Sequence, residues 1–215
     1  MKIVIAGGHG KIALLLTGLL KERGDEVRSL IRNPDHAAEV EEAGAAEAVV
    51  CDLETDDAER IAAAVDGMDA IVFAAGAGPG SGSERKETMD HGGAVKLIEA
   101  SKDRGVDRYV IVSSMGADPD HEGDDTFDVY LRAKGRADAD LAASGLDHTI
   151  VRPGGLTDEP GTGKVFLSER GERGQVPRAD VAAVLAAALA TPAAIGKSFE
   201  LISGETPIED AVAAL

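Results

Sequence analysis

The sequence predicts an α/β protein built on a Rossmann-like, doubly wound parallel sheet of about seven strands, with helices on both faces. Short runs of β-branched, apolar residues alternate along the chain with longer segments of helical periodicity. Parallel strands need crossovers of a dozen or more residues, and helices of this length provide them. Residues 3–5 and 71–73 are apolar at every position, as expected of strands that are buried on both sides.

The strands are expected at residues 2–6, 26–31, 46–51, 70–74, 108–113, 147–151 and 198–202. The helices are expected at residues 10–23, 34–43, 56–65, 85–104, 126–144 and 178–190. Gly24 and Gly105 each follow a basic last turn, which is typical of a helix end. Loops 76–83, 117–125 and 154–163 each follow a strand, so we expect them at the carboxyl edge of the sheet, where ligands bind.

The chain has 215 residues, 44% of them hydrophobic, which fits a single domain with small substrate-side loops near its C-terminal end. Its net charge of −17 is spread along the whole sequence and opposes binding to nucleic acid and to anionic membranes. A dispersed acidic surface is typical of proteins from salt-loving organisms, and an ordinary acidic protein is the alternative. Cys51 is the only cysteine, so an intrachain disulfide is excluded. With no long apolar run and no secretion signal, the location is predicted by elimination to be cytoplasmic.

The first motif lies directly after the first expected strand and opens a helix. It is the segment Gly7-Gly8-His9-Gly10-Lys11-Ile12-Ala13. Glycines allow a sharp turn and a close approach of backbone N–H groups to a pyrophosphate, and the helix N-terminus favours phosphate. The segment therefore predicts a dinucleotide-binding loop, with a purely structural turn as the alternative.

The second expected strand ends in Arg32, where an NAD site usually carries an acidic residue for the ribose hydroxyls. An arginine here favours the 2′-phosphate of NADP(H), although NAD(H) and a merely exposed arginine remain alternatives. After the third strand, Asp52 is placed either to accept from the adenine amino group or to cap a helix, and Leu53 would contact the ring. The small residues after the fourth strand would leave room for the adenine ribose; they are Ala74, Ala75 and Gly76.

A catalytic set is suggested by Ser113 and Ser114 at the end of the fifth strand, followed by Tyr130 and Lys134 on a helix. Positions four apart share a helix face, so Tyr130 and Lys134 are expected to point the same way. A nearby ammonium and the positive nicotinamide ring of the cofactor would lower the pKa of the phenol and favour Tyr130 as an acid/base. Lys134 would also bind the nicotinamide ribose, and a serine hydroxyl would polarise a substrate carbonyl.

In combination, these features resemble the atypical short-chain dehydrogenases/reductases of the NAD(P)H-binding, NmrA-like group. The matching segments are the glycine loop, Val112-Ser113-Ser114-Met115-Gly116, Tyr130-x-x-x-Lys134, Thr149-Ile150-Val151-Arg152-Pro153-Gly154, Val176-Pro177-Arg178-Ala179-Asp180-Val181-Ala182 and Ser203-Gly204-Glu205-Thr206-Pro207-Ile208. The resemblance implies that Tyr130 is the acid/base, Lys134 its partner and Ser114 the carbonyl ligand, with Ser113 as the less favoured alternative. It also implies that Arg152, Pro153 and Gly154 lie beside the nicotinamide, whereas residues 178–181 cap and pack their helix.

The sequence thus predicts an NADP(H)-dependent oxidoreductase of the short-chain type that acts on a small carbonyl or alcohol substrate. The alternative is a non-catalytic NADP(H)-binding redox sensor of NmrA-like type. An epimerase is less favoured, because the chain lacks the extended C-terminal substrate domain of larger relatives. The histidines show no metal-ligand spacing, and the acidic stretch near His121 is expected to be a solvated loop. The partner is a small molecule, and both a monomer and a homodimer are compatible with the sequence.

Overall fold

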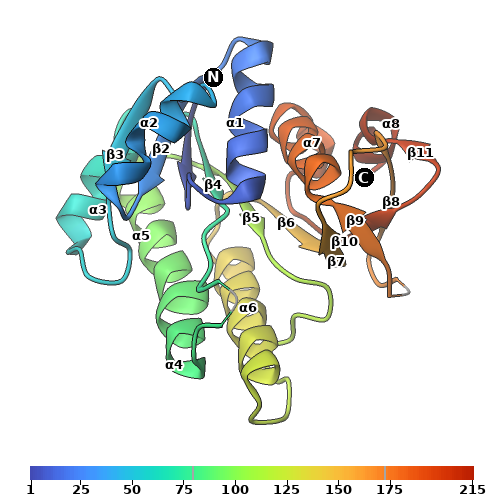
Figure 1. Ribbon diagram of the computed structural model, residues 1–215. Helices are drawn as coiled ribbons and strands as arrows, with labels where there is room; N and C mark the ends of the chain where they lie inside the picture. Colours follow the sequence, from blue (N-terminus) through green and yellow to red (C-terminus); the bar gives the residue numbers. More distant parts are fainter. Residues whose placement is uncertain (79, 172) are drawn as a thin grey trace.

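The computed structural model describes residues 1–78, 80–171 and 173–215, and it has a large twisted sheet between two layers of helices (Figure 1). The main sheet has nine strands in the order β11-β8-β10-β6-β5-β4-β1-β2-β3. The α/β, Rossmann-like fold class is therefore confirmed. The expected number of about seven strands is too low, since β8 and β11 extend the sheet and β7 and β9 form a separate two-stranded sheet.

The seven expected strands form the parallel part of the main sheet. They are β1 (Lys2–Ala6), β2 (Glu26–Ile31), β3 (Glu47–Val50), β4 (Ala70–Phe73), β5 (Arg108–Val112), β6 (Asp147–Pro153) and β10 (Lys197–Ser203). β1 lies between β2 and β4, with Ile3 beside both Val27 and Ala70. Its side chains alternate between two cores, because Ile3 and Ile5 face one layer of helices and Val4 faces the other.

Four strands were not expected: β7 (Gly155–Thr157), β8 (Lys164–Ser168), β9 (Gln175–Pro177) and β11 (Thr206–Pro207). β8 pairs antiparallel with β10 and carries β11 at its outer edge. Its burial pattern is mixed, with Val165 buried and Phe166 half exposed. Residues 154–163, which were expected to form a loop, include the short strand β7. Strands this short depend on their partners, so the local sequence has no strong signal for them.

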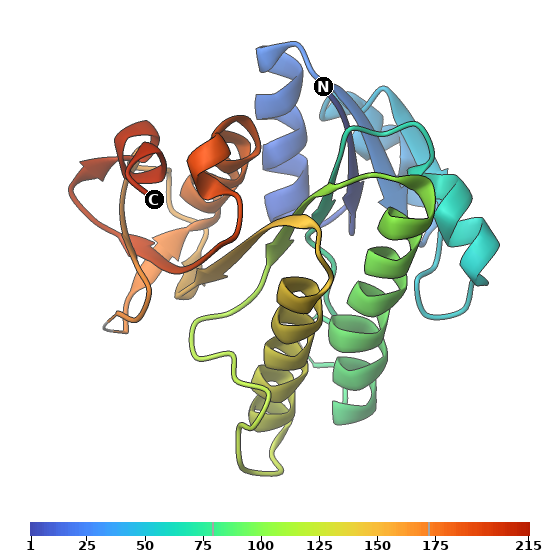
Figure 2. The ribbon, with the colours of Figure 1, turned by 180° about the vertical axis from the view of Figure 1, so that it is seen from behind.

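The helices cover both faces of the sheet. They are α1 (Lys11–Arg23), η1 (Pro34–His36), α2 (Ala37–Glu42), α3 (Ala58–Val65), α4 (Ser83–Arg85), η2 (Lys86–Gly93), α5 (Ala94–Arg104), α6 (Thr126–Ala143), α7 (Arg178–Ala190), η3 (Pro192–Ala194) and α8 (Ile208–Ala213). α1, α7 and α8 pack on one face, and α3, α5 and α6 on the other, as the view from behind also shows (Figure 2). Within the described residues, no helix has the length and apolarity needed to cross a membrane.

The strand order fixes where a ligand can enter. From β1 the chain moves outward through β2 and β3, and then returns across β1 to place β4 on its other side. The connections after β1 and β4 therefore leave the sheet in different directions and open a crevice at the carboxyl ends of the strands. This switch point lies directly at the glycine loop and at residues 74–76.

Candidate functional site

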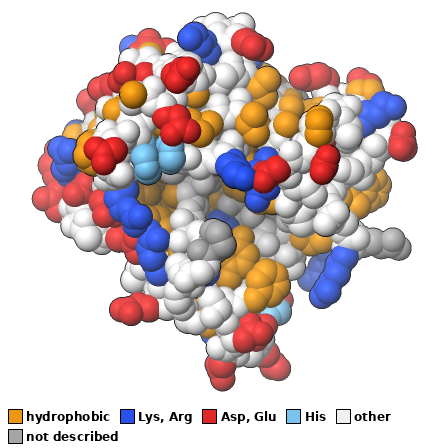
Figure 3. Space-filling view, in the orientation of Figure 1, with side chains coloured by type: hydrophobic (Ala, Val, Ile, Leu, Met, Phe, Trp, Pro, Cys, Tyr) orange, Lys and Arg blue, Asp and Glu red, His pale blue; other side chains and the backbone are white. Residues whose placement is uncertain are grey.

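Two adjoining pockets occupy this crevice and share the backbone of Ala74, Ala75 and Gly76. The first, here called the glycine-loop pocket, has a volume of about 360 Å³ and is lined by Gly7, His9, Gly10, Leu30, Ile31, Arg32, Asn33, His36, Cys51, Asp52, Leu53, Ala77, Arg85 and Met89 besides the shared residues. The second, the tyrosine pocket, has a volume of about 500 Å³ and is lined by Ile12, Gly78, Gly80, Ser81, Lys86, Asp90, Val112, Ser113, Thr126, Phe127, Tyr130, Lys134 and Leu156. The space-filling view shows a hollow surface between the basic and histidine side chains of this face (Figure 3).

The glycine loop forms a tight turn at the start of α1. Gly7 has φ +78°, and a Cβ atom there would lie 2.6 Å from the Cα of Ala75, so only glycine fits. The N–H of Gly10 donates to the carbonyl of Gly7 at 2.8 Å, and α1 begins at the next residue without a side-chain cap. The uncapped N-terminus leaves backbone N–H groups available to an anion.

Gly8 lies behind this loop and does not line either pocket. Its N–H donates to the carbonyl of Leu30 at 2.9 Å, and a Cβ atom there would lie 2.7 Å from the Cβ of Ser29. Position 8 therefore has to be glycine, because any side chain there would collide with β2. Lys11 also points away, because its Nζ lies 2.6 Å from the carboxylate of Asp158.

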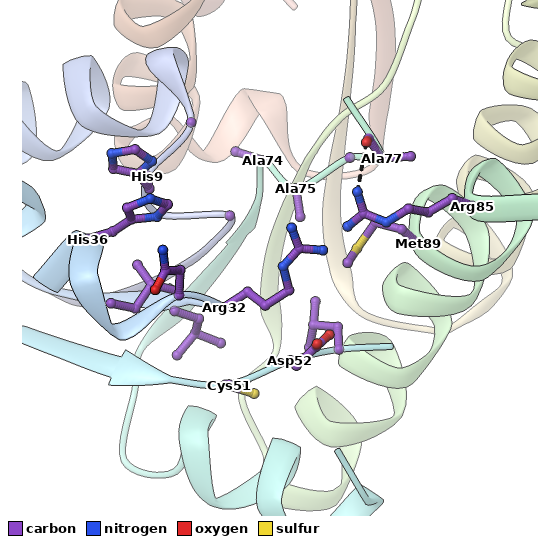
Figure 4. A pocket seen from close by; sticks show the side chains of 17 residues that line it. His9, Arg32, His36, Cys51, Asp52, Ala74, Ala75, Ala77, Arg85 and Met89 are labelled. Carbon is purple, nitrogen blue, oxygen red and sulfur yellow. Dashed lines mark hydrogen bonds between the residues drawn. The ribbon is translucent and has the colours of Figure 1, made fainter. Parts of the chain in front are cut away.

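Arg32 projects into the glycine-loop pocket from the end of β2 (Figure 4). Its side chain is 57% exposed, and its guanidinium lies 3.7 Å from Glu54 Oε2. Asp52 also lines the pocket, and its Oδ1 accepts the N–H of Glu54 at 2.9 Å. Asp57, not Asp52, caps α3 by accepting the N–H of Arg60, so the capping alternative for Asp52 is wrong.

The sequence reasoning missed Arg85, which enters the same pocket from α4. Its Nε and Nη2 both lie 2.9 Å from Glu54 Oε2, and Nη1 donates to the carbonyl of Ala77 at 3.0 Å. Burial alone would raise the pKa of Glu54, but hydrogen bonds from Arg85 and Thr88 outweigh it and lower that pKa. The ionised Glu54 therefore holds two arginines at the mouth of the pocket.

In the tyrosine pocket, Tyr130 and Lys134 lie one turn apart on α6 and face the same cavity, as their spacing predicts. Ser113 lines the pocket as well, but its hydroxyl donates to Asp138 Oδ2 at 2.8 Å. Ser114 is not part of the lining. Its hydroxyl donates to the carbonyl of Met115 at 3.3 Å, and its proximity to Tyr130 lowers the pKa of the phenol.

Lys134 does not lower the pKa of Tyr130 in the structure, contrary to the expectation for this part of the effect. Burial raises the pKa of Tyr130 to about 12, and the carboxylates of Asp90 and Asp138 add to the effect, which proximity to Ser114 opposes. Lys134 instead donates to the carbonyl of Val112 at 2.6 Å. Burial lowers the pKa of Lys134, although Asp90 and Asp138 counteract this.

Two buried carboxylates around Lys134 were not identified from the sequence. Asp90 is 1% exposed, lies in the π-wound segment η2 and accepts the N–H of Ala77 at 3.2 Å. Asp138 is 2% exposed and accepts from Ser113 and from Arg152 Nε, each at 2.8 Å. Burial raises the pKa of both. The i, i+4 spacing of Lys134 and Asp138 was a usable signal for the second carboxylate, because it places both on one helix face.

The segment 152–154 lies outside the lining of both pockets. Arg152 is turned toward Asp138, and the carbonyl of Pro153 accepts the N–H of Met115 at 2.9 Å. Gly154 packs against Gly174, whose carbonyl oxygen would lie 2.4 Å from a Cβ at position 154. Contact of these three residues with a nicotinamide stays a prediction.

Residues 178–181, expected to cap and pack their helix, do pack, since Val181 is fully buried, but α7 has no side-chain cap. Asp180 has a different structural role. It accepts the N–H groups of Thr162 and Gly163, each at 2.9 Å, and so ties that loop to α7. In the acidic stretch, His121 pairs with Asp128 at 3.0 Å. Across the described parts of the chain, no group of three or more His, Cys, Asp or Glu side chains is arranged to hold a metal ion.

The residues present fit an extended dinucleotide. Backbone at Gly7, Gly10 and Ala75 forms a narrow cradle that side chains would fill, and an uncapped helix end faces it. One pocket lies on each side of the shared residues, and the two together provide room for the two halves of such a molecule. Arginine side chains lie on one side of the cradle and Tyr130 and Lys134 on the other.

Comparison with known proteins agrees with this geometry. Residues 7–192 match a protein family described as NAD(P)H-binding. The chain is 40% identical over 213 residues to a Bacillus subtilis protein named as an uncharacterized sugar epimerase, YhfK, with 99% of each chain covered. A solved structure of a Bacillus halodurans protein is 40% identical, with a TM-score of 0.93 and full coverage of both chains. The anaerobillin reductase ChuY of Escherichia coli O157:H7 is 27% identical, with a TM-score of 0.80, 94% of this chain covered and 97% of its own.

Proposed function

Because the chain belongs to the NAD(P)H-binding family of atypical short-chain dehydrogenases/reductases, we propose that it is an NADP(H)-dependent oxidoreductase acting on a small carbonyl or alcohol substrate. The observation that supports this most directly is the junction of the two pockets at Ala74–Gly76. A dinucleotide crossing that junction from Arg32 would bring its reactive end to Tyr130 and Lys134.

The preference for NADP(H) rests on the charges of the glycine-loop pocket. Arg32 is the residue that follows β2, where an acidic side chain would favour the ribose hydroxyls of NAD(H). Its guanidinium is exposed and only loosely paired with Glu54 at 3.7 Å, so it is available to a 2′-phosphate. Arg85 is held more tightly by Glu54 and supports the adenine side of the pocket.

The chemistry rests on the tyrosine pocket. When bound, the nicotinamide supplies or accepts a hydride. With its pKa raised to about 12, Tyr130 keeps its proton at neutral pH and is available as an acid at the phenol oxygen. Lys134 lies one turn away and would stabilise the phenolate that proton transfer leaves. Ser114, which lies near enough to Tyr130 to lower the pKa of the phenol, would orient a substrate carbonyl.

A second candidate function is a binding protein that senses NADP(H) without turnover. The observation in its favour is that Tyr130 and Lys134 are not activated for catalysis. Lys134 donates to the carbonyl of Val112, and the pKa of Tyr130 is raised. A sugar epimerase, the activity in the name of the Bacillus subtilis relative, would use the cofactor without net consumption. Both alternatives therefore differ from a reductase in a measurable way.

The test is calorimetric titration with NADPH and NADH, at low and high salt, of the wild type and of Arg32→Asp. We expect NADPH to bind at least about tenfold more tightly than NADH, and Arg32→Asp to remove the preference. A carbonyl screen that follows NADPH oxidation should then give turnover that Tyr130→Phe reduces about 100-fold or more. Binding without turnover would favour the sensor, and failure of both cofactors to bind would overturn the proposal.

A further inference from the structure

Two histidines form one wall of the glycine-loop pocket. His9 comes from the glycine loop and His36 from the end of η1, and their rings stack with centroids 3.5 Å apart and planes inclined by 16° (Figure 4). Both line the pocket that also holds Arg32. The stack therefore joins the phosphate-binding turn to the segment that follows β2.

The two rings differ in their surroundings. His9 Nε2 lies 2.7 Å from the carboxylate of Glu39 on α2, which fixes the orientation of the ring. Among the described residues, no hydrogen-bond partner is found for the ring nitrogens of His36. The ring that faces Arg32 across the β2–η1 turn is thus the one whose nitrogens are left for a ligand.

Stacking couples the protonation of the two rings. Two imidazolium charges at this separation repel each other strongly, so the stack takes up one proton far more readily than two. An anion that enters beside the stack favours its protonated state. Imidazoles titrate near physiological pH, so the entry of an anion can change the charge of the stack there.

The charges around the stack come from every neighbouring element. On the side of the glycine loop, Lys11 at the start of α1 is paired with Asp158. The segment after β2 carries Arg32, Asp35 in η1 and Glu39 in α2. The opposite side of the pocket carries Asp52, Glu54 and Arg85. Glu54 pairs closely with Arg85, at 2.9 Å, and only loosely with Arg32, at 3.7 Å. In a chain of net charge −17, an additional proton on the histidine stack is a substantial local gain for phosphate binding.

Resting on the NADP(H) preference above, we propose that the His9–His36 stack takes up one proton when a 2′-phosphorylated adenine nucleotide enters the pocket. Proton and phosphate then bind with positive coupling, and linkage requires each to strengthen the other. Selectivity for NADP(H) over NAD(H) therefore rises as pH falls. The second pKa of a phosphate monoester is about 6, so the ligand stays mostly dianionic above about pH 6.5.

The test uses calorimetry with adenosine 2′,5′-bisphosphate and with 5′-AMP at about pH 8.5 and about pH 6.5, at constant ionic strength. We expect the bisphosphate to bind about fivefold to tenfold more tightly at the lower pH, and 5′-AMP to change less than about twofold. Titrations in two buffers with different heats of ionisation should detect net proton uptake for the bisphosphate alone.

Variants separate the stack from the rest of the pocket. His36→Gln should abolish the pH dependence, whereas Arg32→Ala should weaken bisphosphate binding at both pH values and leave the pH dependence in place. The matched control is His91→Gln, because His91 also pairs with a carboxylate at 2.7 Å, that of Asp140, but lies outside the pocket.

Equal tightening of 5′-AMP, or a pH dependence that survives His36→Gln, would overturn the inference. A pH-independent preference for NADPH would overturn it too, yet leave the proposed function intact. If neither NADPH nor the bisphosphate binds to the wild type at any pH, the proposed function itself fails.

Discussion

The two pockets differ in how far their charged side chains are exposed to solvent. At the glycine-loop pocket, the charged side chains are in contact with solvent. The side chain of Arg32 is 57% exposed, and that of its partner Glu54 is 18% exposed. In and behind the tyrosine pocket, the side chains of Lys134, Asp90 and Asp138 are each 2% exposed or less. The first pocket can exchange a protein partner for a ligand at little cost, whereas the second holds a fixed set of buried charges whose energies depend on one another.

The backbone shows a second contrast. The glycine-loop pocket depends on close approach between main-chain segments, most of all where Gly7 meets Ala75. The tyrosine pocket depends on groups that surround Lys134: carboxylates from η2 and α6 and the carbonyl of Val112 in β5. A substitution in the first pocket should therefore act through backbone strain, and one in the second through unpaired buried charge.

The largest effect is expected from Gly7→Ala. The substitution forces an alanine to φ +78° and puts its Cβ 2.6 Å from backbone at Ala75, which together should cost about 2–5 kcal/mol of unfolding free energy. The control Gly24→Ala also has a positive φ, of +89°, but meets open space and should cost only about 1–2 kcal/mol. Urea unfolding measures both, and equal losses would show that the close approach at Ala75 contributes nothing.

A smaller effect is expected from Asp138→Ala, which leaves Ser113 and the partly buried Arg152 without their acceptor. We expect a loss of about 2–4 kcal/mol. Asp138→Asn keeps an acceptor and should lose less. The exposed pair of Arg28 and Glu47, 2.7 Å apart, is the matched comparison, and Glu47→Ala should cost less than about 1 kcal/mol. A loss for Asp138→Ala no larger than that of Glu47→Ala would contradict the contrast between buried and exposed charges.

The smallest effect is the pH dependence of stability that comes from the two tyrosines, and it appears only at alkaline pH. Their ionisation can be followed by absorbance without interference, because the chain has no tryptophan. Burial raises the pKa of Tyr130 to about 12 and that of Tyr109 well above its ordinary value. The folded state thus retains phenol protons that the unfolded state releases near pH 10. The stabilisation is complete below that pH and is lost as pH rises through the folded-state pKa values.

Spectrophotometric titration of the folded, ligand-free protein should therefore show no phenolate below about pH 10. In Tyr130→Phe, the earlier of the two steps should disappear and leave that of Tyr109. Ionisation of Tyr130 near pH 7 or 8 in the absence of cofactor would show that Lys134 already lowers the phenol pKa, contrary to the hydrogen bond that Lys134 makes with Val112.

The sequence predicted the parallel core of the fold with boundaries close to those observed, because buried strands and amphipathic helices carry strong local patterns. It did not predict β8 and β11, whose residues become strands only by pairing with β10 and with each other. The helix expected at residues 85–104 is continuous from residue 83, but its π-wound part, which directs Asp90 inward, has no simple sequence signal.

For the site, the sequence by itself determined the elements that are contiguous in the chain: the glycine loop, the arginine after β2, and the shared face of Tyr130 and Lys134. Only the tertiary structure decided which distant side chains join them. It brought Arg85 to Glu54, His36 to His9, and Asp90 to Lys134. The physical reason is that a turn or a helix face follows from local backbone geometry, whereas the partner of a charge is set by the packing of elements far apart in the sequence.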